Sequence, residues 1–232
     1  MMQEINDLIN KEYKLRYLNK EMELRSLQAQ INPHFIFNTL DSINWAARMH
    51  GLDPVGRMAE SLANLLRISI RDQDKPYRIS EELAYITNYM AIQQYRFEDR
   101  IRLELDVPAE LNDVLIPRLI IQPLLENAIV HNVDTADRPT VIAIRMRPDV
   151  SGSYAVVSVS DNGKGIPGDV IAHIRSSEQE KDAAFPRGLT NVHRRLVLSY
   201  GEEGGLDLSS SEEGTTIQFK IPIEKEEIQN DI

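Results

Sequence analysis

The sequence contains no cysteine, and this absence excludes a disulfide framework, a thiolate metal site and a thiol nucleophile. Long apolar runs are also missing, since no stretch approaches the roughly 18–20 apolar residues that span a bilayer. Residues 1–20 are polar and lack the apolar block of a signal peptide. We therefore expect a soluble chain with a cytoplasmic location, either free or as the cytoplasmic portion of a larger membrane receptor.

Basic residues are outnumbered by acidic ones. The 232 residues include 26 Lys and Arg against 36 Asp and Glu, so the formal net charge is −10. Contacts with nucleic-acid phosphates need a basic surface, which argues against a nucleic-acid partner. Apolar residues make up 42% of the chain, which is enough for one or two domains with buried cores.

The first half of the sequence predicts helices throughout. Near the N-terminus an apolar residue recurs every seven positions, at Leu8, Leu15, Met22 and Ala29. This spacing is typical of a coiled-coil seam, although Lys11 and Arg25 interrupt its second apolar row. A single amphipathic helix on a core is the alternative, but so narrow a stripe favours pairing with a second copy.

Two further helices are predicted to form a hairpin. The helical pattern continues to Arg48, stops at residues 49–51, and restarts at residues 53–54, an Asp-Pro pair suited to a helix start. Helices joined by so short a connection pack antiparallel, and two copies would form a dimeric four-helix bundle. A third helix is expected from Ser80, which can cap its first N–H groups, to about Arg96.

The second half mixes strands and helices. The pattern predicts strands at 101–106, 141–147 and 154–160, helices at 119–131 and 189–200, a glycine- and charge-rich loop at 162–187, and a hairpin of strands at 205–210 and 215–221. A helical half followed by a mixed half predicts an α+β fold. We place the boundary near residue 100, dividing residues 1–100 from 101–232.

Residues 163–168, Gly-Lys-Gly-Ile-Pro-Gly, fit the dinucleotide-binding pattern G-x-G-x-x-G after a predicted strand. The context excludes a Rossmann unit, since residues 176–182 are too polar to form its next buried strand. A protein-kinase loop is excluded because no kinase-type lysine, HRD or DFG motif follows. A Walker A loop needs Ser or Thr after its Gly-Lys pair, and here glycine follows.

Four segments in a fixed order point to a different nucleotide site. They are Gln122–His131 (QPLLENAIVH), Asp161–Pro167 (DNGKGIP), Gly188–Val192 (GLTNV) and Gly214–Thr216 (GTT). Together they resemble the N, G1, G2 and G3 boxes of the superfamily that contains gyrase, the heat-shock chaperone, mismatch-repair ATPases and histidine kinases. The resemblance implies an α/β-sandwich of the Bergerat type that binds ATP with Mg²⁺.

The residue types in the first two segments suit that ligand. Asp161, at the end of a strand, can accept a hydrogen bond from an adenine amino group. Gly163 and Gly165 lack a Cβ and let backbone approach a planar base. Asn127 offers a neutral oxygen suited to Mg²⁺. His131 lies four residues after Asn127, so the two share a helix face.

The last two boxes extend the candidate site. Gly188, before a predicted helix, leaves free N–H groups and a positive dipole end for phosphate. The resemblance adds Leu189 and Asn191 from the same box and Thr215 from the final one. Each candidate alone has an ordinary explanation, such as a turn aspartate or a hairpin Gly-Thr pair, but four boxes in order outweigh it.

A fifth segment narrows the resemblance to one kinase type. Leu27–Leu40 has the sequence LQAQINPHFIFNTL and resembles the phosphoacceptor box, N-P-H-F-x-F-N, of the LytS/YesM-type sensor histidine kinases. In that family the histidine accepts the γ-phosphoryl group of ATP and passes it to an aspartate of a response regulator, which here implies His34. Pro33 supports a special role, because a proline inside a helical stretch costs about 3 kcal/mol and kinks it beside the imidazole.

Two departures from the family pattern leave open questions. Phe35 follows the histidine where many histidine kinases have an acid, so the catalytic base is unassigned. Glu126 is the candidate, although it points some 100° away from Asn127 on the helix. Pro186 stands where a second glycine is usual in the G2 box, which puts the ATP lid in question.

Asn38 lies one helical turn beyond His34, so both side chains share a face. By resemblance to other histidine-kinase families, Asn38 is placed to orient a water toward a phospho-aspartate docked over His34. The alternative is a hydrogen bond from Asn38 to a neighbouring helix of the bundle.

The sequence as a whole predicts the cytoplasmic core of a homodimeric sensor histidine kinase that serves a response-regulator receiver domain. A degenerate kinase that binds nucleotide and scaffolds a partner is one alternative, and Pro186 favours it. A serine-phosphorylating anti-sigma kinase is another, but it needs neither the His34 box nor the helical first half.

Overall fold

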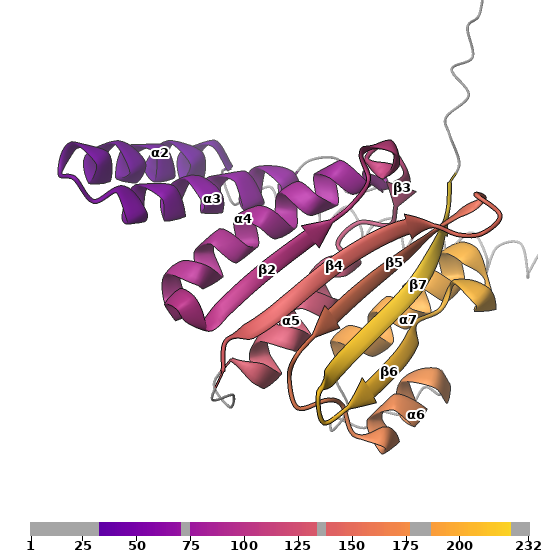
Figure 1. Ribbon diagram of the computed structural model, residues 1–232. Helices are drawn as coiled ribbons and strands as arrows, with labels where there is room; N and C mark the ends of the chain where they lie inside the picture. Colours follow the sequence, from indigo (N-terminus) through magenta and orange to yellow (C-terminus); the bar gives the residue numbers. More distant parts are fainter. Residues whose placement is uncertain (1–32, 71–74, 134–137, 177–186, 224–232) are drawn as a thin grey trace, which may run out of the picture.

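The computed structural model describes residues 33–70, 75–133, 138–176 and 187–223. Two long helices, α2 (Pro33–Met49) and α3 (Asp53–Ile70), project from a body in which helices lie against a twisted sheet (Figure 1). The heptad seam at 8–29 lies outside the described residues. Pro33 is the first of them, so the predicted kink stays a prediction. None of the described helices is long and apolar enough to cross a membrane.

The predicted α2–α3 hairpin is confirmed. Its turn requires glycine at Gly51, where φ is +72°, and the Leu52 N–H donates to Ala47 O (2.8 Å) to close the end of α2. Where the helices meet, a Cβ added at Gly56 would come within 2.9 Å of Asn44 Oδ1. Gly56 therefore lets the two helices approach closely.

The helix α4 (Ile79–Phe97) begins before the predicted Ser80, and Ser80 does not cap it. Ser80 is the second helical residue, and its N–H donates to Asn112 O (3.0 Å). Glu81 closes the start instead, because its carboxylate accepts the Arg78 N–H at 2.9 Å. The glutamate in the first turn, rather than the serine, is therefore the local start signal.

A five-stranded sheet forms the body, in the order β2–β4–β5–β7–β6. Its strands are β2 (Ile101–Asp106), β4 (Thr140–Pro148), β5 (Tyr154–Asp161), β6 (Asp207–Ser211) and β7 (Gly214–Pro222). The β2–β4 pair is parallel and the other pairs are antiparallel. The short strands β1 (Tyr77–Arg78) and β3 (Leu115–Ile116) form a separate antiparallel ribbon.

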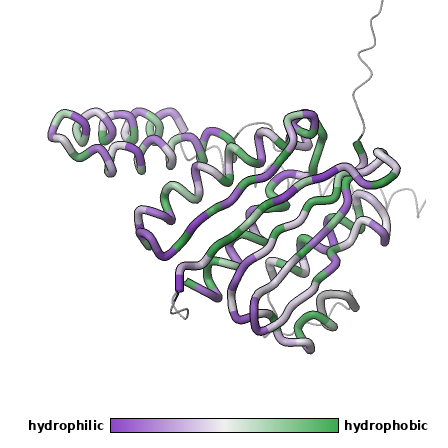
Figure 2. The backbone as a smooth tube through the Cα atoms, viewed as in Figure 1, coloured by the Kyte–Doolittle hydropathy of each residue, from purple (hydrophilic) through white to green (hydrophobic). Residues whose placement is uncertain are grey.

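Helices cover one face of this sheet. Figure 1 shows α5 (Ile121–Asn132) and α7 (Arg187–Tyr200) behind the strands. Hydrophobic and hydrophilic residues alternate along the strands (Figure 2), and the buried positions of β7 alternate in the same way. Short 3-10 helices at η1 (Glu98–Arg100), η2 (Ala109–Leu111) and η3 (Glu202–Gly204) connect these elements. The predicted α+β class is confirmed.

The helix α4 shares one apolar core with the sheet. Ile79, Ile86 and Met90 are buried in the same cluster as residues of the strands, α5 and α7. This burial groups α4 with the second half of the chain. The division of residues 1–100 from 101–232 stays a prediction.

The predicted loop over 162–187 contains a helix, α6 (Gly168–Ser176). It begins after Pro167, whose carbonyl accepts the Ile171 N–H at 3.2 Å. Val170 and Ile171 lie against the core. The glycine and charge content of the segment concealed this short helical pattern.

Candidate functional site

A cavity of about 420 Å³ lies where the C-terminal half of α5 faces the ends of β5 and β7. Its lining residues come from widely separated parts of the chain and are Asn127, His131, Asn132, Asp161, Lys164, Gly165, Ile166, Pro167, Val170 and Thr215. Five of the predicted binding residues therefore meet in one pocket, of a size that holds a small organic ligand.

The helix α5 contributes Asn127 and His131, which lie one turn apart and both line the cavity. Glu126 is not among the lining residues. Gln122 Nε2 donates to its Oε1 at 2.6 Å, and the Glu126 carboxylate raises the pKa of Tyr85 and Tyr89 on α4, in both cases after burial as the main cause. Glu126 therefore lies on the α4 side of α5.

Asp161 ends β5 with its carboxylate half-buried. Its Oδ1 accepts the Gly163 N–H (2.8 Å) and the Asn132 amide (3.1 Å). Burial raises the pKa of Asp161, and these two donors with the Thr215 N–H oppose that rise. The bonds fix the orientation of the carboxylate at the wall of the pocket.

Asn132 is a site residue that the sequence prediction missed. Its side chain is buried, its Nδ2 donates to Ala128 O (2.9 Å) and to Asp161, and its Oδ1 accepts the Lys164 N–H (3.3 Å). Asn132 follows Leu125 and Ala128 on one face of α5, and both are buried. A polar residue on that apolar face was the available signal.

The two predicted glycines are required by close approaches within the protein. A Cβ at Gly163 would lie 2.0 Å from Asn132 Oδ1. Gly165 has φ of +80°, and its Cβ would lie 2.2 Å from Ser211 O. The sequence suggested glycine here so that the backbone could approach a planar base. The structure adds a second reason, because a side chain at either position would collide with the protein itself.

Thr215 joins the site from the β6–β7 hairpin and is buried. Its Oγ1 lies 3.2 Å from Ser210 Oγ, which accepts the Ile166 N–H at 2.6 Å. The hairpin thereby holds the loop that begins at Gly163 against the pocket.

Residues of the third box do not line the pocket. Gly188 is the second residue of α7, so it lies in the first turn and not before it. Leu189 is buried in the core, whereas Gly188 and Asn191 are exposed. Pro186 lies outside the described residues. Their proposed phosphate contacts stay predictions.

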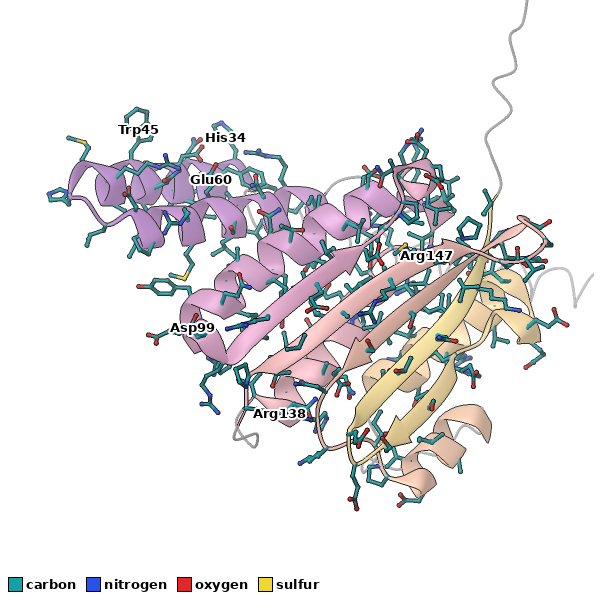
Figure 3. The ribbon with its side chains drawn as sticks, in the orientation of Figure 1. His34, Trp45, Glu60, Asp99, Arg138 and Arg147 are labelled. Carbon is teal, nitrogen blue, oxygen red and sulfur yellow. The ribbon has the colours of Figure 1, made fainter. Side chains whose placement is uncertain are left out.

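His34 lies on α2, away from this pocket. Figure 3 shows His34 and Trp45 on the outer side of α2, pointing away from the sheet. Asn38 Nδ2 donates to His34 Nδ1 at 3.3 Å, so the predicted shared face of the two side chains is present. Both are exposed, and the structure does not bring either of them to Asn127 or Asp161.

Within the described ranges, no group of three His, Asp or Glu side chains is placed to bind a metal ion through protein ligands alone. Mg²⁺ at a nucleotide keeps several waters and takes phosphate oxygens, so one neutral oxygen ligand suffices. The amide of Asn127, on the pocket wall, fits this requirement.

Two family models match the chain. The model described as Histidine kinase matches residues 22–101, and the model described as Histidine kinase-, DNA gyrase B-, and HSP90-like ATPase matches residues 112–225. Between them they include both the His34 segment and the four nucleotide boxes.

Curated relatives match most of the chain. Sensor histidine kinase YesM of Bacillus subtilis is 39% identical over 97% of this chain and 38% of the relative. Sensor histidine kinase YpdA of Escherichia coli is 37% identical over 92% of this chain and 36% of the relative. Sensor protein LytS of Staphylococcus haemolyticus is 31% identical over 88% of this chain and 35% of the relative. The chain thus spans less than half the length of these relatives.

Solved structures also resemble the chain. The histidine kinase domain of the Erythrobacter litoralis blue-light activated histidine kinase is similar with a TM-score of 0.47 and 18% identity. That likeness covers 83% of this chain and 94% of the domain.

Proposed function

The chain belongs to the sensor histidine kinases of the LytS/YesM type, a family of ATP-dependent phosphotransferases, and we propose that it binds Mg-ATP and transfers the γ-phosphoryl group to His34. One observation carries the proposal. Residues of the N, G1 and G3 boxes, far apart in sequence, line one cavity of about 420 Å³.

The residues of the pocket suit the parts of the nucleotide. Asp161, with its carboxylate oriented by Gly163 and Asn132, would accept the adenine amino group. Asn127 would contribute an oxygen to Mg²⁺, which when bound neutralises phosphate charge. His131, one turn from Asn127, would face the same ligand.

The acceptor would be the neutral imidazole of His34. A ring nitrogen forms the new bond to the γ-phosphorus, the bond from that phosphorus to the bridging oxygen breaks, and ADP leaves. The second ring nitrogen can then release its proton to a base. Glu126 remains the candidate base, although its present contacts with Gln122 lie toward α4.

We further propose a homodimer through α2 and α3, with a receiver domain as phosphoryl acceptor. Large apolar side chains are exposed on the hairpin, namely Phe35, Ile43, Trp45, Met49 and Leu62. An exposed apolar surface of this kind favours a protein partner. In a cell the chain would act as the cytoplasmic portion of a larger membrane receptor.

The test is incubation of the purified chain with γ-labelled ATP and Mg²⁺. Acid-labile, alkali-stable label on the chain is the expected result, since phosphohistidine has that stability. Acid-stable label would favour serine phosphorylation. Nucleotide binding without any label would favour a degenerate kinase that only scaffolds a partner. The observation that favours this alternative is Pro186, which stands where the G2 box usually has a second glycine.

A further inference from the structure

The last turn of α3 is held by a side chain of the ATP-binding half. Helix C-termini leave carbonyl groups without helical partners, and these groups carry partial negative charge. The Arg118 guanidinium donates to Ile68 O (3.1 Å) and Ser69 O (3.4 Å). Arg118 precedes α5, so a cation beside the nucleotide-binding helix closes the end of the hairpin that carries His34.

Tyr77 on β1 completes this contact. Its hydroxyl donates to Ile68 O at 2.7 Å and accepts a bond from Arg118. The guanidinium carbon lies 4.3 Å from the centroid of the Tyr77 ring. Burial raises the pKa of Tyr77 against the opposing effect of Arg118, so the phenol stays a neutral donor at physiological pH.

The elements on the far side of these contacts form one rigid support. Glu82 on α4 is fully buried, and its carboxylate accepts the N–H groups of Leu119 (2.9 Å) and Ile121 (2.8 Å) at the start of α5. Removing a buried acceptor that satisfies two helix N–H groups is costly, so α4 and α5 move together.

The contact between α3 and α4 is incomplete along its length. A groove of about 450 Å³ opens between them, lined by Arg57, Asn64, Asn88, Gln94 and other residues of the two helices. Asn64 Nδ2 donates to Asn88 Oδ1 across part of the groove at 3.2 Å. The polar contacts at the C-terminal end of α3 therefore add to the packing of α3 on α4.

We propose that Tyr77 and Arg118 form a latch, the α3 latch, which holds the hairpin in its present orientation and so keeps His34 from the pocket of the same chain. His34 is exposed on α2, which packs on α3, which in turn packs on α4. Phosphoryl transfer within the chain therefore requires the hairpin to reorient, and release of the latch permits it.

The geometric part of this proposal can be tested without any kinase activity. Because the chain has no cysteine, spin labels can be placed at Met49→Cys on α2 and Val150→Cys on the β4–β5 turn, both exposed. The distance is measured in a mixture with excess unlabelled chain, so that it reports on one molecule. Arg118→Met, which keeps an aliphatic chain over Tyr77, should broaden the distance distribution.

Arg147→Met is the matched control, because Arg147 pairs with Asp106 at the sheet edge and away from α3. Tyr77→Phe removes only the hydroxyl that bonds Ile68 O and Arg118, and it serves if Arg118→Met fails to fold. A distribution identical to that of the parent chain in a folded latch variant overturns the latch.

The effect on rate rests on the proposed function. In Arg118→Met and Tyr77→Phe the initial rate of His34 phosphorylation at saturating ATP should rise at least threefold, with the Kd for ATP unchanged. If the distance distribution broadens but the rate of His34 phosphorylation is equal or lower, the latch does not restrain phosphoryl transfer and this part of the proposal is wrong. If the parent chain takes no label, the proposed function fails, and the distance distribution still decides the latch.

Discussion

At the scale of the residue, the proposed phosphoryl acceptor His34 can be compared with a second histidine of the same hairpin, His50. His34 and His50 are both exposed on the α2 side of the hairpin, and His50 Nδ1 lies 2.8 Å from Ala46 O. We expect His34→Gln to abolish labelling from γ-labelled ATP, and His50→Gln to retain it. Both variants should bind ATP as the parent chain does, because neither residue lines the pocket. Label that persists on His34→Gln would reject the assignment.

Asn38 donates to His34 Nδ1, which places a neutral amide beside the proposed phosphorylation site. We expect Asn38→Ala to slow the decay of the phosphorylated regulator and to leave autophosphorylation near the parent rate. Thr39→Ala is the matched control, since the Thr39 hydroxyl bonds Phe35 O of its own helix (2.8 Å). Unchanged decay combined with slower autophosphorylation would assign Asn38 to structure or to the forward reaction.

His193 makes stability depend on pH. Its buried Nδ1 accepts the Leu206 N–H at 3.0 Å, and burial lowers its pKa against an opposing effect of Glu202. The unfolded-state pKa is about 6.5, so the folded chain binds fewer protons below that pH. This contribution to stability is complete above pH of about 6.5 and is lost as the pH falls toward the folded-state pKa.

The measurement is the melting temperature of the parent chain and of His193→Asn between pH of about 7.5 and 5.5. The asparagine oxygen replaces Nδ1 as acceptor but does not titrate. The parent chain should lose more stability than the variant over this range. Equal losses in the two proteins would exclude His193 as the cause.

At the scale of the element, the start of the loop after β5 depends on one contact with α5. Gly163→Ala would place a Cβ on the Asn132 amide and should lower the free energy of unfolding by about 1–3 kcal/mol, as overpacking does. ATP binding should weaken too, because Asn132 also holds Asp161. Gly168→Ala is the control, since its Cβ would meet nothing within 4 Å.

A double-mutant cycle identifies the cause. In the Asn132→Ala background the clash is removed, so Gly163→Ala should cost less than it does in the parent chain. Equal costs in the two backgrounds would mean that the loop backbone, and not the contact with Asn132, sets the requirement for glycine.

The elements that the sequence predicted well are those whose signal is local. The hairpin turn at Gly51, the strand β2 at its predicted bounds and the one-turn spacing of Asn127 and His131 need only a few neighbouring residues, and the structure contains each of them. What was missed depends on partners distant in sequence. Glu82 satisfies the start of α5 from about forty residues away, and no local pattern could connect them.

The same distinction explains the errors at helix starts. Ser80 has the residue type of a cap, but α4 begins one residue earlier, at Ile79. The Ile79 N–H donates to Val114 O (2.9 Å), a residue beside β3 and distant in sequence. The contacts of α6 with the core are likewise tertiary. Local propensity alone could not predict either outcome.

At the scale of the whole molecule, the hairpin exposes large apolar side chains on both of its helices. Ile43 on α2 and Leu62 on α3 are each about two-fifths exposed, at 43% and 40%. If these two residues pack against a second copy, a carboxylate placed at either position would be dehydrated in the interface without an ion-pair or hydrogen-bond partner, which is costly. We therefore expect Ile43→Glu and Leu62→Glu to raise the dimer dissociation constant at least tenfold, which corresponds to about 1.4 kcal/mol.

Leu198→Glu is the matched control for the dimer. Leu198 is an exposed leucine on α7, in the ATP-binding half, at 76% exposure, so its replacement should leave the dissociation constant unchanged. Sedimentation equilibrium across a concentration series measures all three variants. ATP affinity should be equal in every one, because none of these positions lines the pocket. A parent chain that sediments as a monomer at tens of micromolar, or hairpin variants that dimerise like Leu198→Glu, would assign the exposed apolar residues of α2 and α3 to a partner other than a second copy.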